Sequence, residues 1–236
     1  MRMSSGANIS RRKSSTVPRR ALITSGRAAA AGMIGAAVFG LVVFVLTLVE
    51  YPFLQGIGWS PVAQSGVPWP SGLALGPYGS VQVANFLLFG LTMIIFAIGL
   101  HRGVNDGRGS IFGPSSLVLA GAALILLGFK TDPRLLSTGP QTWHGWIHAL
   151  AFLLLVGSLL LSFLFMWWRF RRDDRWRGYD RYTLLTAVLY VVLYFLPGQI
   201  ALYFFLTVVL VWVEVISIRL RSIARDASPR GTGHPR

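Results

Sequence analysis

The chain has 236 residues, of which 53% are hydrophobic and only 13% charged, and its formal net charge is +14. A soluble domain carries about 25% charged residues, so this composition is typical of a protein whose main solvent is lipid. The basic residues fall in short blocks between apolar runs and leave no basic domain, which argues against a nucleic-acid partner. Because there is no cysteine, disulfides, thiolate nucleophiles and cysteine-ligated metals are excluded.

Residues 1–27 are basic and serine-rich and contain no acid. With so little apolar surface, this segment is predicted to be a disordered cytoplasmic tail. The apolar run that follows, residues 28–49, is long enough to cross a bilayer core of about 30 Å at about 1.5 Å per residue. Small residues recur every four positions along it, which favours close packing against another helix. These residues are Ala28, Gly32, Ala36 and Gly40.

Residues 51–80 form the longest connection, with five prolines and neither lysine nor arginine. The prolines argue against a long helix in this stretch. Trp59 and Trp69 in an uncharged loop predict a cap that lies on the membrane surface, and a lid over a site is equally compatible with the pattern.

Further apolar runs predict more membrane-spanning helices. The expected spans are residues 28–49, 81–100, 111–129, 140–170, 182–196 and 199–218. Pro140 suits the first turn of the fourth span, with Ser137 or Thr138 as its N-cap. Residues 28–221 are therefore interpreted as one membrane domain, and residues 222–236 as a second disordered cytoplasmic tail.

Lysine and arginine are divided unequally between the two faces that six crossings create. Seven lie in the N-terminal tail, two in residues 101–110, six in residues 169–181 and five in the C-terminal tail, all on one face. The other face receives only Lys130 and Arg134. Because basic loops stay inside, both termini are predicted to be cytoplasmic, with the basic loops contacting anionic lipids. The sequence thus predicts an all-α, polytopic protein with six transmembrane helices in the plasma (inner) membrane of a bacterium.

Three ionisable side chains come to the outer face in this topology, namely Asp132, His144 and His148, with Glu50 as an accessory group at the end of the first span. The two histidines are four residues apart and share one helix face. Two imidazoles and a carboxylate can form a zinc site open to water, which would activate that water for hydrolysis of a lipid or lipid-linked substrate. Asp132 can instead orient one histidine as a general base without a metal.

A structural interpretation of the same residues is also open. Asp132-Pro133 is a common turn start, and His144 can simply face lipid headgroups. His148 can hydrogen-bond to an amide across the bundle, the candidates being Gln82, Asn85 and Gln199. The His-x-x-x-His pattern lacks the glutamate of the metalloprotease signature. A third interpretation is that the cluster handles protons or ions.

Haem is disfavoured as a cofactor. Histidines four apart on one helix cannot bind one iron from opposite faces, and His101 and His234 belong to the other side of the membrane. No catalytic residue can be assigned from a complete motif, so a non-enzymatic transporter, sensor or scaffold is the alternative to a metal-assisted hydrolase.

Two stretches of the chain resemble a known family. The first is GPYGSVQVANFLLFG, which enters the second span, and the second is Thr131-Asp132-Pro133 followed by TWHGWIH at residues 142–148. Over roughly residues 28–219 the chain resembles a family of small bacterial six-helix membrane proteins known as domain of unknown function 998. It departs from that pattern where Lys130 replaces an expected proline and Ser80 an expected aromatic residue. The resemblance implies a six-helix membrane fold with a polar cluster, and it implies no particular reaction.

Overall fold

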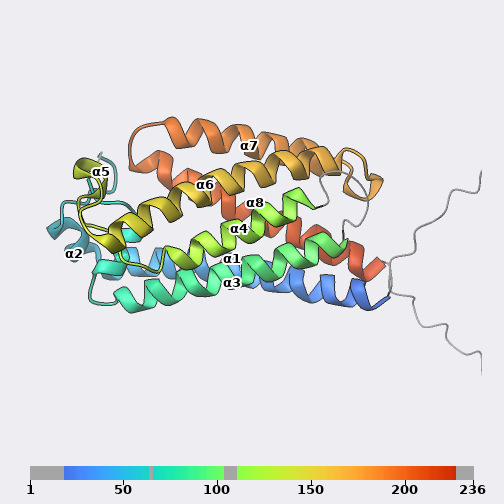
Figure 1. Ribbon diagram of the computed structural model, residues 1–236, viewed down its shortest axis with the longest axis horizontal. Coiled ribbons are helices and arrows are strands. Elements are labelled where there is room, and N and C mark those ends of the chain that lie inside the picture. The colour runs from blue at the N-terminus through green and yellow to red at the C-terminus, as the bar shows by residue number, and fades with distance from the viewer. Residues whose placement is uncertain (1–18, 64–65, 104–110, 227–236) are drawn as a thin grey trace, which may run out of the picture.

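The structure, a computed structural model, describes residues 19–63, 66–103 and 111–226. Within these ranges it contains helices and no strand (Figure 1). In chain order the helices are α1 (Arg19–Val49), α2 (Tyr51–Gly56), the 3-10 helix η1 (Ser71–Leu75), α3 (Gly79–Gly103), α4 (Phe112–Leu126), α5 (Leu135–Thr138), α6 (Trp143–Phe170), the 3-10 helix η2 (Asp174–Trp176), α7 (Tyr179–Phe195) and α8 (Gln199–Asp226).

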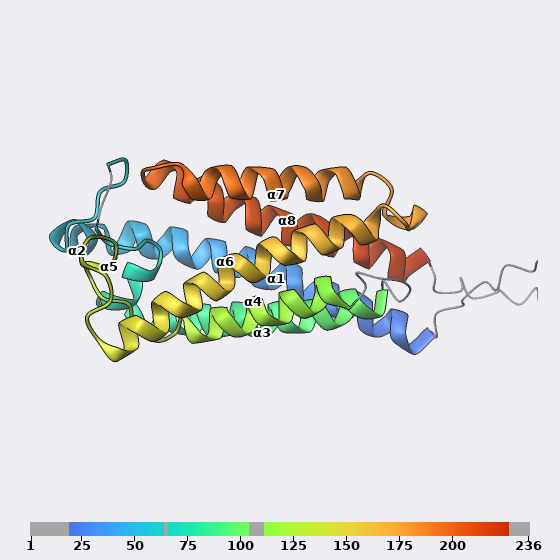
Figure 2. The same cartoon turned by 45° about the horizontal axis from the view of Figure 1, so that its top comes forward.

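The long helices α1, α3, α4, α6, α7 and α8 run side by side in alternating directions (Figures 1 and 2). Each packs against the next one along the chain, and α8 packs back against α1, which closes the bundle. The short helices α2 and α5 lie together at one end of the bundle, and both ends of the described chain lie at the other. We call these the cap end and the terminal end.

Small residues bring the helix backbones close together. A Cβ on Gly121 of α4 would lie only 2.7 Å from the carbonyl oxygen of Gly90 on α3. A Cβ on Gly32 of α1 would lie 2.6 Å from the Ser217 hydroxyl of α8. Close approach of this kind gives van der Waals contact and is a main source of helix association in lipid. The packing role predicted for the small residues of α1 is confirmed at Gly32.

Four helices are long and apolar enough to cross a membrane: residues 25–49 of α1, then α3, α6 and α8. Helix α4 is apolar but has 15 residues, and α7 has 17. The all-helical membrane class expected from the sequence is therefore supported by these four helices.

The first and last helices are longer than the apolar runs indicated. Residues 19–27 and 222–226 are helical, where the sequence predicted disordered tails. The two extensions support each other, since Ser25 is buried and a Cβ on Gly26 would lie 3.5 Å from that of Ala224. Tertiary packing of this kind, rather than local propensity, stabilises most helices. The predicted tails outside these residues, 1–18 and 227–236, lie outside the described part of the chain.

Candidate functional site

The polar cluster is built around the first turn of α6. Thr142 is the N-cap of this helix, and its hydroxyl oxygen accepts the N–H of Gly145 at 3.0 Å. The predicted start at Pro140 with Ser137 or Thr138 as the cap was wrong, because those two hydroxyls donate to the carbonyl oxygen of Arg134 in the α5 turn. A threonine directly before the apolar run is the ordinary N-cap position.

Asp132 is only 5% exposed and lies against the start of α6. Its Oδ2 accepts the backbone N–H groups of Gln141 at 2.8 Å and Thr142 at 3.2 Å, and its Oδ1 accepts the Thr142 hydroxyl at 2.7 Å. Burial alone would raise the pKa of Asp132, but these hydrogen bonds outweigh burial and lower it below the usual value. A charged carboxylate is also favoured at the amino end of a helix.

His144 is joined to the same hydroxyl. Its Nδ1 lies 2.8 Å from the carbonyl oxygen of Lys130 and 3.0 Å from the Thr142 hydroxyl. A carbonyl oxygen only accepts, and the hydroxyl proton of Thr142 is directed to Asp132. The Nδ1 atom of His144 therefore carries a proton and donates it.

His148 is the most deeply placed member of the cluster, with 2% of its surface exposed. Its Nδ1 lies 2.8 Å from the carbonyl oxygen of Phe129, so Nδ1 again carries the proton. Its Nε2 lies 2.9 Å from the hydroxyl of Ser71 in η1, and in the neutral ring this nitrogen accepts the hydroxyl proton.

The ring nitrogens of His148 bond to Phe129 and Ser71 rather than to the amides considered, which were Gln82, Asn85 and Gln199. Asn85 of α3 donates to the carbonyl oxygen of Phe39 at 3.2 Å and to the Gln82 side chain at 3.3 Å. Asn85 thus joins α1 to α3, while His148 joins α6 to η1 and to the connection after α4.

The cluster ties three segments together, namely η1, the connection between α4 and α6, and the start of α6. Both histidine Nδ1 atoms are directed to backbone carbonyls, and Asp132 reaches His144 only through Thr142. Within residues 19–63, 66–103 and 111–226, no three histidine, aspartate or glutamate side chains are placed to hold one metal ion. The geometry is that of a hydrogen-bonded clasp, and the zinc centre stays a prediction.

Sequence reasoning missed three residues of this clasp. Gly145 has no room for a side chain, because a Cβ there would collide with the Asp132 carboxylate. Thr142 could have been found from its position before the apolar run. Ser71 carried no signal, since its role depends on a contact between residues 77 positions apart.

Glu50 is buried at the cap end but belongs to a different contact. Its Oε1 accepts the N–H of Tyr78 at 2.6 Å, and a Cβ on Gly76 would collide with its carboxylate. Burial raises the pKa of Glu50 by more than the Tyr78 hydrogen bond lowers it. Glu50 thus holds the turn that leads into α3, and these contacts do not join it to the Asp132 cluster.

An open hollow of about 490 Å³ lies next to the clasp. It is lined by residues 56–58 and 66–67 and by Pro133, Arg134 and Ser137. The hollow therefore reaches the neighbour of Asp132, while none of the three predicted site side chains lines it.

These features define an all-helical protein with membrane-length apolar helices and a polar clasp at one end of its bundle. The model of a family described as a protein of unknown function (DUF998) matches residues 40–219, and the chain belongs to this family. The resemblance drawn from the two sequence stretches is confirmed in this respect. Comparisons with curated proteins and with solved structures found no match.

Proposed function

We propose that this protein is a six-span membrane scaffold with both termini in the cytoplasm. In this proposal Asp132, His144 and His148 hold η1 and the connection between α4 and α6 against the start of α6. The observation that carries the proposal is the direction of the polar atoms. The carboxylate of Asp132 and the Nδ1 atoms of both histidines are directed to backbone groups of the loops they join.

Six spans are supported by the outer faces of the two shorter helices. Leu185 and Val188 on α7 are 57% and 52% exposed, and Leu119 and Leu126 of α4 are exposed as well. At about 1.5 Å per residue these helices are roughly 22–26 Å long, and tilted flanking helices or local thinning of the bilayer accommodate such a mismatch. If these helices lay outside the membrane, the same apolar side chains would face water, which costs about 25 cal/mol per Å² of exposed apolar surface.

The sidedness is supported by the position of the charges. The terminal end contains both described chain ends and the connection 171–178, whereas the connections at the cap end contain only Lys130 and Arg134 as basic residues. Because the native chain has no cysteine, single cysteines report sidedness directly. In intact cells, a membrane-impermeant maleimide is expected to label Ser137→Cys, and to label Arg225→Cys only after permeabilisation. The reverse pattern, or labelling of both in intact cells, would refute the proposed topology.

The clasp role is tested by separating stability from metal content. We expect His148→Ala to lower the melting temperature of the purified protein, and a chelator to leave the wild-type melting temperature unchanged. Stoichiometric zinc in the wild type that is lost in His148→Ala would favour the metal-assisted hydrolase instead.

One contact favours a metal-independent hydrolase as a second candidate. The Ser71 hydroxyl donates to Nε2 of a histidine whose other nitrogen is fixed by a carbonyl, which is the geometry of an activated nucleophile. A fluorophosphonate probe would then label Ser71 in the native protein, and labelling would be lost in Ser71→Ala and in His148→Ala. Absence of labelling in native protein would remove this candidate.

A further inference from the structure

The connection between α6 and α7, at the terminal end, is held in one conformation. The Trp176 ring is fully buried and stacks on Phe170, with ring centroids 4.2 Å apart and planes 13° from parallel. Gly178, with a φ of 88°, makes the left-handed turn into α7 that a side chain would oppose. The side chains around this connection are therefore presented from a fixed backbone.

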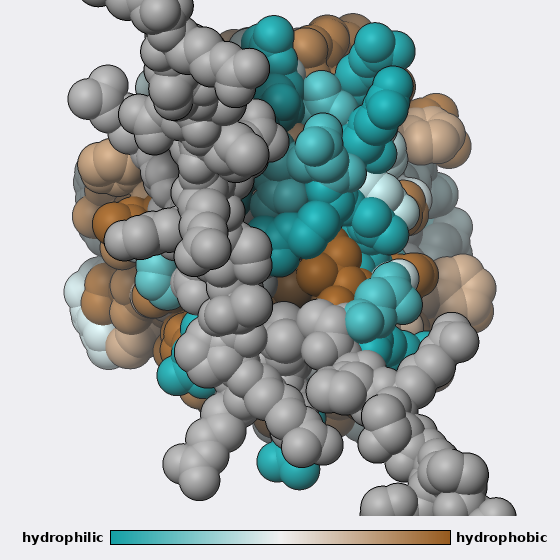
Figure 3. All heavy atoms as spheres, turned by 90° about the vertical axis from the view of Figure 1, so that its right-hand side faces the viewer, coloured by the Kyte–Doolittle hydropathy of each residue, from teal (hydrophilic) through white to brown (hydrophobic). Residues whose placement is uncertain are grey.

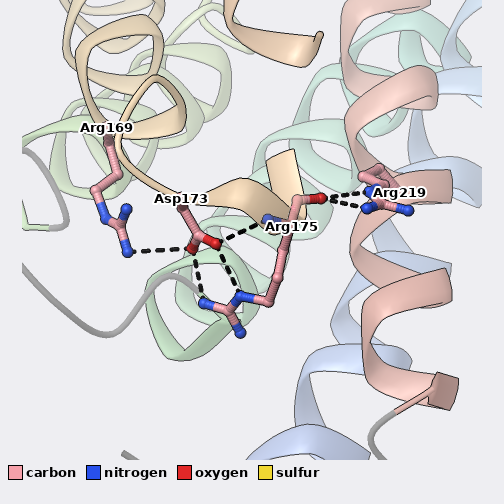
Figure 4. A network of polar contacts seen from close by, with 4 residues as sticks. All are labelled: Arg169, Asp173, Arg175 and Arg219. Carbon is pink, nitrogen blue, oxygen red and sulfur yellow. Dashed lines mark hydrogen bonds and ion pairs between the residues drawn. The ribbon is translucent and has the colours of Figure 1, made fainter. Parts of the chain in front are cut away.

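Asp173 organises the charges inside the connection (Figure 4). It forms ion pairs with Arg169 at 3.3 Å and with Arg175 at 2.8 Å. Arg219 of α8 donates through Nε to the carbonyl oxygen of Arg175 at 2.8 Å, which attaches the connection to the last helix. The negative charge of Asp173 is thus balanced by Arg169 and Arg175.

A pocket of about 390 Å³ lies beside this network. Its charged lining consists of three arginines, Arg171, Arg177 and Arg181, and three aspartates, Asp173, Asp174 and Asp180. Within the described residues, both ion pairs involve Asp173, so neither uses these three guanidinium groups. The amino end of α7 borders the same pocket and adds its positive partial charge.

The proposed membrane placement puts this pocket at the depth of the lipid headgroups. The guanidinium of Arg171 lies over the Trp167 ring at 5.2 Å, and that of Arg172 lies over the Trp168 ring at 4.9 Å. Tryptophans gather at the membrane interface, and arginine side chains reach from there to the phosphates. Figure 3, which looks onto the terminal end, shows hydrophilic residues over much of the part of this face that is not grey, with hydrophobic residues between them and at the sides.

We propose that this pocket binds one phospholipid headgroup, with its phosphate at Arg171, Arg177 and Arg181. Guanidinium groups recognise phosphate oxygens through pairs of hydrogen bonds. Asp174 and Asp180 then accept hydrogen bonds from donors on the same headgroup, which selects a glycerol or ethanolamine headgroup over choline. The inference rests on the proposed membrane placement of α6 and α7, and it does not depend on which side the terminal end faces.

The test uses the full-length protein in detergent, titrated separately with phosphatidylglycerol, phosphatidylethanolamine and phosphatidylcholine and followed by native mass spectrometry. The variant Arg171→Gln/Arg177→Gln/Arg181→Gln is compared with Arg102→Gln/Arg221→Gln/Arg225→Gln, which removes the same charge elsewhere. Each pocket arginine is expected to contribute roughly fivefold to affinity, as a basic side chain near an anionic surface does. The pocket variant should therefore bind roughly a hundredfold less phosphatidylglycerol than the control.

Folding is checked by the melting temperature of both triple variants, and single Arg177→Gln and Arg181→Gln variants replace the triple variant if it unfolds. Equal lipid binding by pocket and control variants would overturn the site. Equal binding of all three lipids by the wild type would overturn the role given to Asp174 and Asp180. Both outcomes are distinct from failure of the cysteine-labelling test, which concerns sidedness alone.

Discussion

Asp132 at the cap end and Asp173 at the terminal end are both kept ionised, but by different kinds of partner. Asp132 is surrounded by two backbone N–H groups and a hydroxyl. Asp173 is held chiefly by the guanidinium of Arg175, with Arg169 adding to it, and these contacts lower the pKa of its carboxyl despite burial. Dipoles fixed by the backbone depend on geometry and are insensitive to salt, whereas partly exposed ion pairs are screened by it. The two ends should therefore respond to different perturbations.

Gly145→Ala should break the cap end most severely, because its Cβ would collide with the Asp132 carboxylate. Overpacking of this kind costs about 3 kcal/mol at its upper range, and here it also displaces the cap hydrogen bonds. The measurement is unfolding of purified protein in mixed micelles. Gly157→Ala is the matched control on the same helix, since nothing lies within 4 Å of its Cβ. Equal effects of the two substitutions would contradict the clasp geometry.

Asp132→Asn should cost about 2 kcal/mol at neutral pH, because it removes the charge that two N–H groups and a hydroxyl stabilise. The folded pKa of Asp132 is lowered, so its contribution is present above the unfolded pKa of about 3.9 and is lost as pH falls through the folded pKa. In melting curves recorded from neutral to acidic pH, the variant should not show this loss of stability in acid. Asp174→Asn, at an exposed position, serves as the control. If Asp132→Asn lost stability in acid as the wild type does, the stabilising role given to the Asp132 carboxylate would be contradicted.

Asp173→Asn should cost less, about 1 kcal/mol, since the Arg175 side chain is 41% exposed and its pairing is weakened by water. The difference in free energy of unfolding between this variant and the wild type should shrink as the sodium chloride concentration is raised. The Asp132→Asn difference should stay constant over the same range. If both differences follow salt in the same way, the contrast between dipoles and ions is wrong.

Glu50→Gln should have the smallest effect, a gain of about 0.5 kcal/mol at neutral pH. The folded pKa of Glu50 is raised by burial, so its favourable contribution is present below the unfolded pKa of about 4.3 and is lost as pH rises through the folded pKa. A glutamine oxygen can still accept the Tyr78 N–H without a buried charge. Melting curves that show a loss of stability at neutral pH would indicate that the carboxylate has a charged partner.

Local pattern was sufficient for the helices and for part of the site. Apolar length identified α1, α3, α6 and α8, and proline density identified the connection between α1 and α3. The Asp132-Pro133 turn is confirmed by the hydrogen bond from the Leu135 N–H to the Asp132 carbonyl at 3.1 Å. The α6 boundary was missed because several possible caps precede it, and only their contacts decide between them.

The sequence by itself determined the class of protein, the family and three residues of the polar cluster, Asp132, His144 and His148, because hydrophobic length, charge asymmetry and short motifs are properties of neighbouring positions. Only the tertiary structure decided what those residues contact. Asp132 meets the start of α6, His148 meets Ser71, and Asp173 is linked through Arg175 to Arg219 of α8. Such partners lie on different helices or loops, and their approach depends on the packing of the whole bundle rather than on any local pattern.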